Sequence, residues 1–212
     1  MVLELTAVLA LAQRCAPSVA PETMLTIVQV ESHYNPLAIN VNGAADPAPA
    51  RTTQEAIRTA EALIGQGRSV DLGLGQINSK NLGWLGMSVA DAFDACRNLA
   101  GAARVLEAAY LSAARLAPQQ QALRMAFSAY NTGDHRRGFA NGYVAKVEAA
   151  ASRVVPALGG VDPAPPSAPT PAQLAQEIAT ENLSGQAPLA EEPPPWDVFA
   201  RTKASPVLVF GR

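Results

Sequence analysis

The sequence has few aromatic residues, little cysteine and no excess of charge of either sign. Phe, Trp and Tyr make up 5% of its 212 residues, and there are two cysteines. Sixteen Lys and Arg stand against 18 Asp and Glu, which gives a net charge of −2. Without a basic excess the chain is poorly suited to neutralise a phosphate backbone, so we do not expect nucleic acid as a partner.

Long hydrophobic runs are also missing. The longest, residues 2–12, is interrupted by Glu4 and is shorter than the roughly 20 residues that a membrane-spanning helix needs. It also lacks the basic start of a secretory signal, and Arg14 is unlike the small residues that precede a cleavage or lipidation site. We therefore predict no membrane span and no readable export signal, and we expect this segment to form a first core helix.

The two cysteines, Cys15 and Cys96, lie far apart and neither belongs to a cluster with metal-ligand spacing. A zinc site is not expected. The residues alone leave two possibilities open, namely two buried thiols in a cytosolic protein or one disulfide in an exported protein.

The first three quarters of the chain consist of helical patterns rich in Ala and Leu, with no convincing set of alternating strands. They predict a mainly α domain over residues 1–156, built from about six or seven helices. The second helix should begin at Pro21 and stop at Asn35-Pro36, because the residue before a proline is pushed out of the helical region. The later helices are expected at residues 53–64, 89–92, 96–114, 118–130 and 143–155.

Residues 157–212 differ in composition from the rest of the chain. They contain DPAPPSAPTPA and EEPPP, proline-rich stretches that cannot continue a helix. We predict a largely flexible tail. Its last part, WDVFARTKASPVLVF at 196–210, has enough Trp, Phe and Val to act as a docking peptide for another protein.

Glu31 stands where a carboxylate is costly. It ends an apolar helix on the same face as Ile27 and Val28, so burial and the negative end of the helix dipole should both raise its pKa. A raised pKa is what a general acid requires. For a glutamate taken alone, however, the more common interpretation is a solvent-facing side chain in a fraying last turn.

The segment DLGLGQINS at residues 71–79 places two carboxamides, Gln76 and Asn78, among glycines that allow another chain to approach the backbone. Carboxamides both donate and accept hydrogen bonds, which suits sugar hydroxyl and N-acetyl groups. The segment therefore indicates either the wall of a sugar-binding groove or a turn whose glycines serve packing only.

The segment SAYNTG at residues 128–133 ends an apolar helix with Tyr130, Asn131 and a C-terminal glycine signal. Tyr130 could project its hydroxyl across a cleft. Taken alone, the pattern favours a core tyrosine followed by an ordinary helix cap.

Three motifs follow one another along the chain: ESxxNP at 31–36, GLGQIN at 73–78 and AYNTG at 129–133. In this order they strongly resemble the lysozyme-like domain of the soluble lytic transglycosylase family, over about residues 15–155. The resemblance is closest to the specialised lytic transglycosylases of type IV secretion systems. Three details indicate that subgroup: the long insertion between the first two motifs, CRN at 96–98 and NGYV at 141–144.

This resemblance implies a lysozyme-like helical fold and an enzyme that cleaves peptidoglycan without water. The bond broken is the one between N-acetylmuramic acid and N-acetylglucosamine, and the product carries a 1,6-anhydro end. Glu31 matches the family's single catalytic glutamate, acting first as acid and then as base. The residues that would bind substrate are Gln76, Tyr130, Asn131, Ser32, Asn78 and Tyr143, with Tyr130 orienting Glu31 or the substrate.

The resemblance further implies a Cys15–Cys96 disulfide, a periplasmic location and peptidoglycan glycan strands as partner, with secretion-system subunits bound through the tail. Neither metal nor organic cofactor is expected, because proton transfer and ring closure need only an acid, a base and orientation. We expect Asp71 to cap its turn or contact sugar rather than act as a nucleophile. His135 should be a solvated loop residue.

Two other functions remain open. The chain could be a non-enzymatic scaffold of the secretion apparatus, with the tail as its binding element. It could also be a hydrolytic muramidase that leaves reducing ends.

Overall fold

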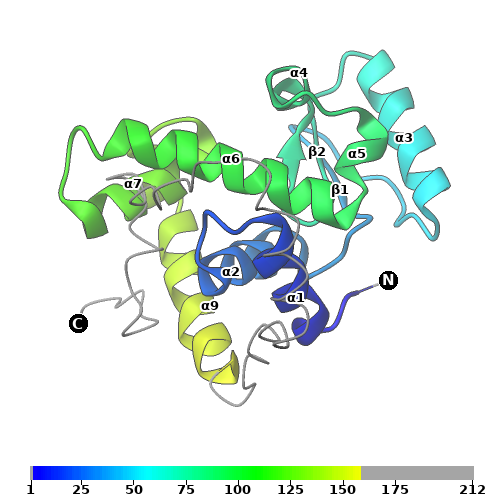
Figure 1. Cartoon of the computed structure of the whole chain (residues 1–212). Coiled ribbons are helices and arrows are strands. Elements are labelled where there is room, and N and C mark those ends of the chain that lie inside the picture. Colours follow the sequence, from blue (N-terminus) through cyan, green and yellow to red (C-terminus); the bar gives the residue numbers. More distant parts are fainter. Residues whose placement is uncertain (1, 159–212) are drawn as a thin grey trace, which may run out of the picture.

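The computed structural model of the chain describes residues 2–158 (Figure 1). Its mainly helical architecture confirms the predicted fold class. Most of the predicted tail, including the proposed docking peptide at 196–210, lies outside the described residues. The elements are α1 (Leu5–Cys15), α2 (Pro21–Ser32), β1 (Ile39–Val41), α3 (Thr53–Gly65), β2 (Val70–Leu72), β3 (Ile77–Asn78), the 3-10 helix η1 (Ser79–Asn81), α4 (Leu82–Leu85), α5 (Val89–Ala92), α6 (Ala95–Ala113), α7 (Gln119–Thr132), α8 (Arg137–Ala140) and α9 (Tyr143–Leu158).

The larger of two lobes is built around α6, the long helix that runs across Figure 1 above α2. It packs against α1 and α7, while α2 packs against α9. Its buried face carries Leu99, Ala103, Leu106 and Tyr110, which follow helical spacing. Together with apolar residues of α1, α2, α7 and α9 they form one continuous core.

The smaller lobe contains a three-stranded antiparallel sheet in the order β1-β2-β3, covered by α3, α4 and α5. In the sheet Asn40 lies opposite Asp71, which in turn lies opposite Asn78. The prediction that the domain lacks strands is wrong here. The strands are two or three residues long, too short to reveal the alternation of apolar and polar residues from which a strand is recognised.

The end of α2 determines where Glu31 lies. The helix stops at Ser32 because His33 and Tyr34 adopt left-handed backbone conformations, with φ of 51° and 63°. This is before the predicted stop at Asn35-Pro36. The Asn35 carboxamide instead accepts a hydrogen bond from the backbone of Leu37 (3.0 Å), which turns the chain toward β1.

Other helix ends lie close to their predicted positions. The helix α3 begins at the predicted residue, and the hydroxyl of Thr52 accepts a hydrogen bond from the backbone N–H of Glu55 (3.2 Å). The helix α9 continues beyond its predicted end, through Pro156 to Leu158. Pro156 has no N–H to donate to the carbonyl of residue 152, so the last turn lacks one helical hydrogen bond.

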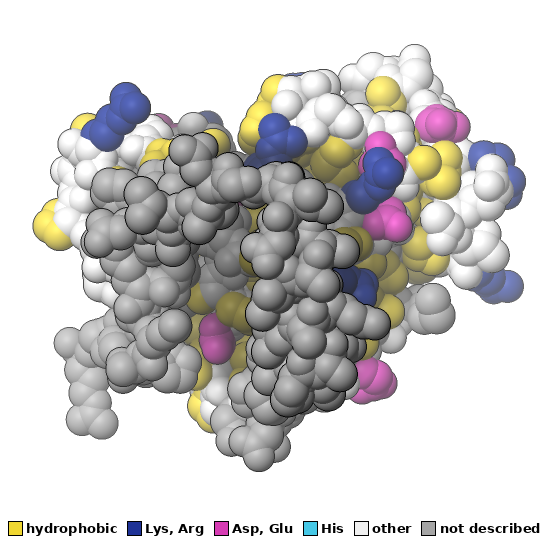
Figure 2. All heavy atoms as spheres, in the orientation of Figure 1, with side chains coloured by type: hydrophobic (Ala, Val, Ile, Leu, Met, Phe, Trp, Pro, Cys, Tyr) yellow, Lys and Arg dark blue, Asp and Glu magenta, His cyan; other side chains and the backbone are white. Residues whose placement is uncertain are grey.

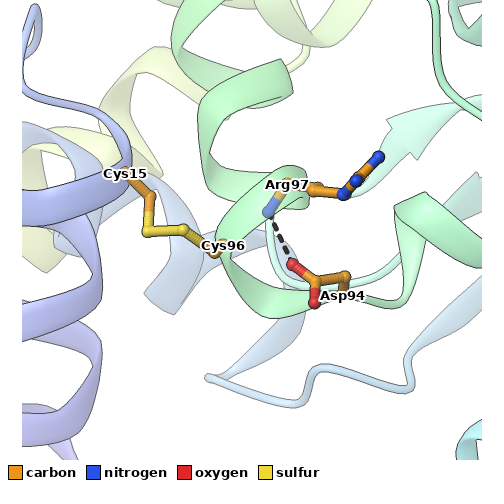
Figure 3. Close-up of a disulfide and its surroundings, with 4 residues drawn as sticks. All are labelled: Cys15, Asp94, Cys96 and Arg97. Carbon is orange, nitrogen blue, oxygen red and sulfur yellow. Dashed lines mark hydrogen bonds between the residues drawn. A yellow bond between two sulfur atoms is a disulfide. The ribbon is translucent and has the colours of Figure 1, made fainter.

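A disulfide joins Cys15 at the end of α1 to Cys96 in the first turn of α6 (Figure 3), as the family resemblance implied. The two Cα atoms are 5.3 Å apart. The same turn of α6 is capped by Asp94, whose carboxylate accepts a hydrogen bond from the backbone N–H of Arg97 at 2.8 Å. The bridge therefore anchors the start of the central helix to the N-terminal helix.

Acidic and basic side chains are interspersed over the described surface in Figure 2. This mixture agrees with the nearly balanced composition of the chain. From residue 2 to residue 158, no helix combines the length and the hydrophobicity that crossing a bilayer would require.

Candidate active site

A groove of about 740 Å³ is lined by residues of both lobes. The larger lobe contributes Glu31 at the end of α2, Tyr130 on α7 and one side of α6. The smaller lobe contributes Asp71 and Gln76 from the sheet and its turn. The structure thus brings the three sequence motifs, ESxxNP, GLGQIN and AYNTG, to a single site.

Glu31 is a partly buried carboxyl group in the wall of this groove. Burial strongly disfavours its charged form, a hydrogen bond from Tyr143 partly opposes this effect, and the negative charge of Asp71 adds to it. The net result raises the pKa of Glu31 to about 7. Near neutral pH the residue can therefore both give and take a proton, which agrees with the expected raised pKa and excludes the ordinary solvent-facing glutamate.

Two tyrosines lie near Glu31, the buried Tyr143 and the partly buried Tyr130, and they have different partners. The hydroxyl of Tyr143, the first residue of α9, donates a hydrogen bond to Oε1 of Glu31. The hydroxyl of Tyr130 instead donates to the backbone carbonyl of Gly75 (2.6 Å). Of the two roles expected of Tyr130, the contact to Glu31 is made by Tyr143 instead, and the orientation of the substrate stays a prediction. Burial and the nearby negative charge raise the pKa of both tyrosines well above the usual value, so both remain neutral donors.

Two glycines of the GLGQIN turn have no room for a side chain. A Cβ atom on Gly73, whose φ is 73°, would lie 2.2 Å from the carbonyl oxygen of Ala92. A Cβ on Gly75 would lie 2.6 Å from the Cβ of Ala102 and 3.0 Å from the hydroxyl of Tyr130. The turn therefore packs closely against the end of α5 and against α6, and a side chain at either position would force its neighbours to shift.

Gln76 follows this turn and is buried, with a left-handed φ of 49° that non-glycine residues seldom adopt. Its amide nitrogen donates to the carbonyl oxygens of Gly73 (2.8 Å) and Ala38 (3.3 Å). Its amide oxygen has no hydrogen-bond partner within residues 2–158. That oxygen is itself buried, so the side chain is fixed in the groove wall through its amide nitrogen, and its role in binding substrate stays a prediction.

Asn98 is the most important residue near the site that the sequence analysis did not identify as functional. It lies buried on α6 and accepts a hydrogen bond from the backbone N–H of Gly75 (2.7 Å). It also donates to the carbonyl oxygens of Leu72 (2.9 Å) and Ala92 (2.7 Å). One side chain thus fixes the GLGQIN turn to α6. Its position in the CRN element was the only sequence signal that could have revealed it.

Asp71 and Asn78 form a polar cluster at the sheet end of the groove. The carboxylate of Asp71 accepts hydrogen bonds from the carboxamides of Asn78 (2.7 Å) and Asn42 (2.9 Å). Burial raises the pKa of Asp71, and these two hydrogen bonds work against the increase. Asn78 lines the groove, but its amide nitrogen already donates a hydrogen bond to Asp71.

The remaining predicted residues differ in position. Asn131 lines the groove, and its side chain accepts a hydrogen bond from Asn141 (3.0 Å). Ser32 is buried and lies outside the groove lining, because its hydroxyl donates to the carbonyl of Val28 (3.2 Å). His135 lines the groove and is partly buried. The sequence analysis also missed a further set of lining residues, contributed by η1 and α4: Lys80, Asn81 and Trp84.

The described residues contain no group of three or more His, Cys, Asp or Glu side chains that could hold a metal ion. The chemical groups that converge on the groove are a carboxyl group of raised pKa, a second carboxylate, phenolic hydroxyls and carboxamides. Such a set suits proton transfer to and from a polyhydroxyl substrate.

Comparison with known families supports this arrangement. Residues 9–152 match the Transglycosylase SLT domain, which is more than half of the chain. The chain belongs to this family. Glu31 and every other groove residue described above fall inside the matched segment of the SLT domain.

Similar curated proteins give the same result. Protein virB1 of Rhizobium radiobacter is 44% identical over 147 residues, which cover 69% of this chain and 62% of that protein. Type IV secretion system protein virB1 of Brucella abortus is 45% identical over 150 residues, covering 68% of this chain and 63% of the relative. The chain therefore spans somewhat more than 60% of the length of the curated relatives it matches. No solved structure matches it significantly.

Proposed function

We propose that this SLT-domain protein is a peptidoglycan lytic transglycosylase that opens the cell wall locally, in the periplasm, for the assembly of a type IV secretion system. The substrate bond is the β-1,4 bond from N-acetylmuramic acid to N-acetylglucosamine. The observation that carries the proposal is Glu31, a single carboxyl group with a pKa of about 7 in a groove large enough for sugar rings. The family match and the names of the virB1 relatives support the biological setting.

The reaction requires two proton transfers, and Glu31 is suited to both. As an acid it protonates the glycosidic oxygen, and the bond from this oxygen to C1 of the muramic residue breaks. The oxygen of the C6 hydroxyl then forms a bond to C1 and gives its proton to the Glu31 carboxylate, which closes the anhydro ring and restores the acid. No water is consumed. A pKa near the working pH serves both steps, because neither protonation state is strongly favoured.

The neighbouring side chains orient these steps. Tyr143 holds one carboxyl oxygen of Glu31 through a hydrogen bond, so the other oxygen is available to the substrate. Gln76 lines the groove, and the two hydrogen bonds from its amide nitrogen to backbone carbonyls fix the wall against which the glycan lies. Tyr130 and Asn131 line the groove and limit the position of the glycan.

Mass spectrometry of the products released from purified peptidoglycan tests the reaction. The wild-type protein should release anhydro-muropeptides and the Glu31→Gln variant should release none. Release of the same products by the variant would remove Glu31 from the mechanism. A folded, oxidised wild-type protein that releases nothing would overturn the enzymatic proposal and favour the scaffold function.

Hydrolysis is the second candidate, because Asp71 lies in the same groove and its charge acts on Glu31. Glycosidases commonly use two carboxylates, one of which activates a water molecule or attacks the sugar. Hydrolysis would give reducing muramic ends in place of anhydro ends. With hydrolysis, Asp71→Asn should also lower the activity on peptidoglycan as much as Glu31→Gln does, whereas transglycosylation needs only one carboxyl group.

We also propose that residues 196–210 dock on secretion-system subunits. The support is their sequence, in which Trp196, Phe199 and Phe210 stand among polar residues. Deletion of 157–212 should then reduce secretion in cells while the purified protein still cleaves peptidoglycan. Normal secretion by the truncated protein would refute the docking role.

A further inference from the structure

Trp84 is an exposed aromatic residue in the groove wall that the proposed reaction does not use. It is 50% exposed, although large apolar side chains are usually buried. The short helix α4 is anchored by Leu82 and Leu85, which are buried in the core of the small lobe. Trp84 lies between them and instead lines the groove, on an element that Figure 1 places well away from α2.

The orientation of the indole ring is set before any ligand arrives. Its N–H donates a hydrogen bond to the side-chain oxygen of Asn81 (3.2 Å). The guanidinium of Arg104 lies over the ring, 5.4 Å from its centroid, and donates to the carbonyl of Leu85 (2.8 Å). The edge and one face of the ring are therefore occupied by protein groups, and the rest of the indole is presented to the groove in a fixed position.

A fixed, half-exposed indole in a polar groove suits a pyranose ring. Such a ring has a face formed by C–H groups, which is apolar, while its hydroxyl and acetamido groups point outward. Stacking this face on an aromatic ring removes apolar surface from water on both partners and leaves the polar groups free for hydrogen bonds. The carboxamide of Asn81, which also lines the groove, lies beside the indole and offers a further polar contact.

We propose that Trp84 is a stacking platform for a sugar ring of the glycan strand, at a subsite separate from the bond that Glu31 cleaves. This inference rests on the proposed function for one point only, the identity of the ligand as a strand of N-acetylated sugars. The platform binds the strand and takes no part in proton transfer. It holds a neighbouring sugar so that the scissile bond is placed at Glu31.

Binding to insoluble peptidoglycan, measured by co-sedimentation of the full chain, tests this role. All variants carry Glu31→Gln, so that cleavage does not change the substrate. Replacing an aromatic anchor of a binding site commonly lowers affinity about tenfold. Trp84→Leu should therefore bind peptidoglycan about tenfold more weakly than its parent. Trp84→Phe keeps a flat aromatic face and should recover most of the affinity. Phe139→Leu is the matched control, because Phe139 is exposed but does not line the groove.

Two results would overturn the platform. One is a Trp84→Leu variant that binds as tightly as its parent. The other is an equal loss in Trp84→Leu and Trp84→Phe, since the hydrogen bond to Asn81 rather than the aromatic face would then be decisive. Thermal denaturation of each variant shows whether it is folded.

Fluorescence gives a second measurement that needs no substitution of Trp84. The chain has two tryptophans, so Trp196→Phe in the Glu31→Gln protein leaves Trp84 as the only one. Soluble glycan strands, freed of peptide by an amidase, should change its emission, and an unchanged emission at saturating glycan would contradict stacking. If the wild-type protein yields no anhydro products while Trp84-dependent binding persists, the proposed reaction fails and the platform stands.

Discussion

Replacing Glu31 should stabilise the protein, and the effect should depend on pH. The pKa of Glu31 is about 7 in the folded protein, against 4.5 for an unperturbed glutamate. The unfolded chain therefore releases this proton at lower pH than the folded protein does. Between these two pKa values the free energy of unfolding falls as the pH rises. Above pH 7 the burial of ionised Glu31 lowers it by the full amount, about 3 kcal/mol. Glu31→Gln removes the ionisation and with it this cost.

Urea unfolding of the oxidised protein at about pH 4 and about pH 8 measures the effect. At the lower pH the wild-type carboxyl group is protonated in both states, so the variant and the wild type should differ little. At the higher pH the variant should have the larger free energy of unfolding, by up to about 3 kcal/mol. Glu61→Gln is the control, because Glu61 is exposed on α3 and its replacement should leave the difference between the two pH values unchanged.

The reasoning would be refuted if Glu31→Gln gave the same change in stability at both pH values. A constant gain would indicate better packing of the amide rather than relief of a buried charge. A loss of stability at the higher pH would mean that the ionised carboxylate is stabilised by its surroundings, so that the hydrogen bond from Tyr143 outweighs burial.

Three further predictions concern the support of the site. Tyr143→Phe removes a hydrogen bond that favours ionised Glu31, so the pKa of Glu31 should rise further. The alkaline limb of the pH–activity profile should then move to higher pH while turnover falls. An unchanged alkaline limb in pH–rate measurements would contradict the contact. Asn98→Ala removes the hydrogen bonds to three backbone groups, those of Leu72, Gly75 and Ala92, and product assays should show a loss of turnover together with a fall in Tm, as expected of a positioning residue. Cys15→Ser with Cys96→Ser should lower the free energy of unfolding by roughly 4 kcal/mol in the chain-entropy account, and urea unfolding with an unchanged midpoint would argue against the bridge.

Features set by local physical chemistry could be predicted from the sequence. The start of α2 at Pro21, the start of α3 and the bounds of α5 follow from capping residues and from the helical spacing of apolar residues. The raised pKa of Glu31 follows from an apolar helix that ends in a carboxylate. For the helix bounds the residues that decide the structure lie within a few positions of one another, whereas the pKa of Glu31 also depends on Asp71 and Tyr143, which are distant in the sequence.

Features that depend on contacts between distant segments could not be predicted in this way. The three strands are held by pairing across the insertion, and their own residues are too few to show a pattern. Trp84 looks like an ordinary core residue until α4 is seen to bury Leu82 and Leu85 instead. Asn98 gains its role only where α6 meets the GLGQIN turn, a contact made across 23 residues of sequence.

The first turn of α6 explains how two lobes keep one site in register. Cys96 connects this turn to α1 in the larger lobe, and two residues later Asn98 connects it to the turn that carries Gln76 in the smaller lobe. Tyr130 adds a second connection, because it comes from α7 and donates a hydrogen bond to the same turn at Gly75. A relative movement of the lobes would have to break the hydrogen bonds of Asn98 and Tyr130, so the distance from Glu31 to the opposite wall of the groove is held by this hydrogen-bond network rather than by the substrate.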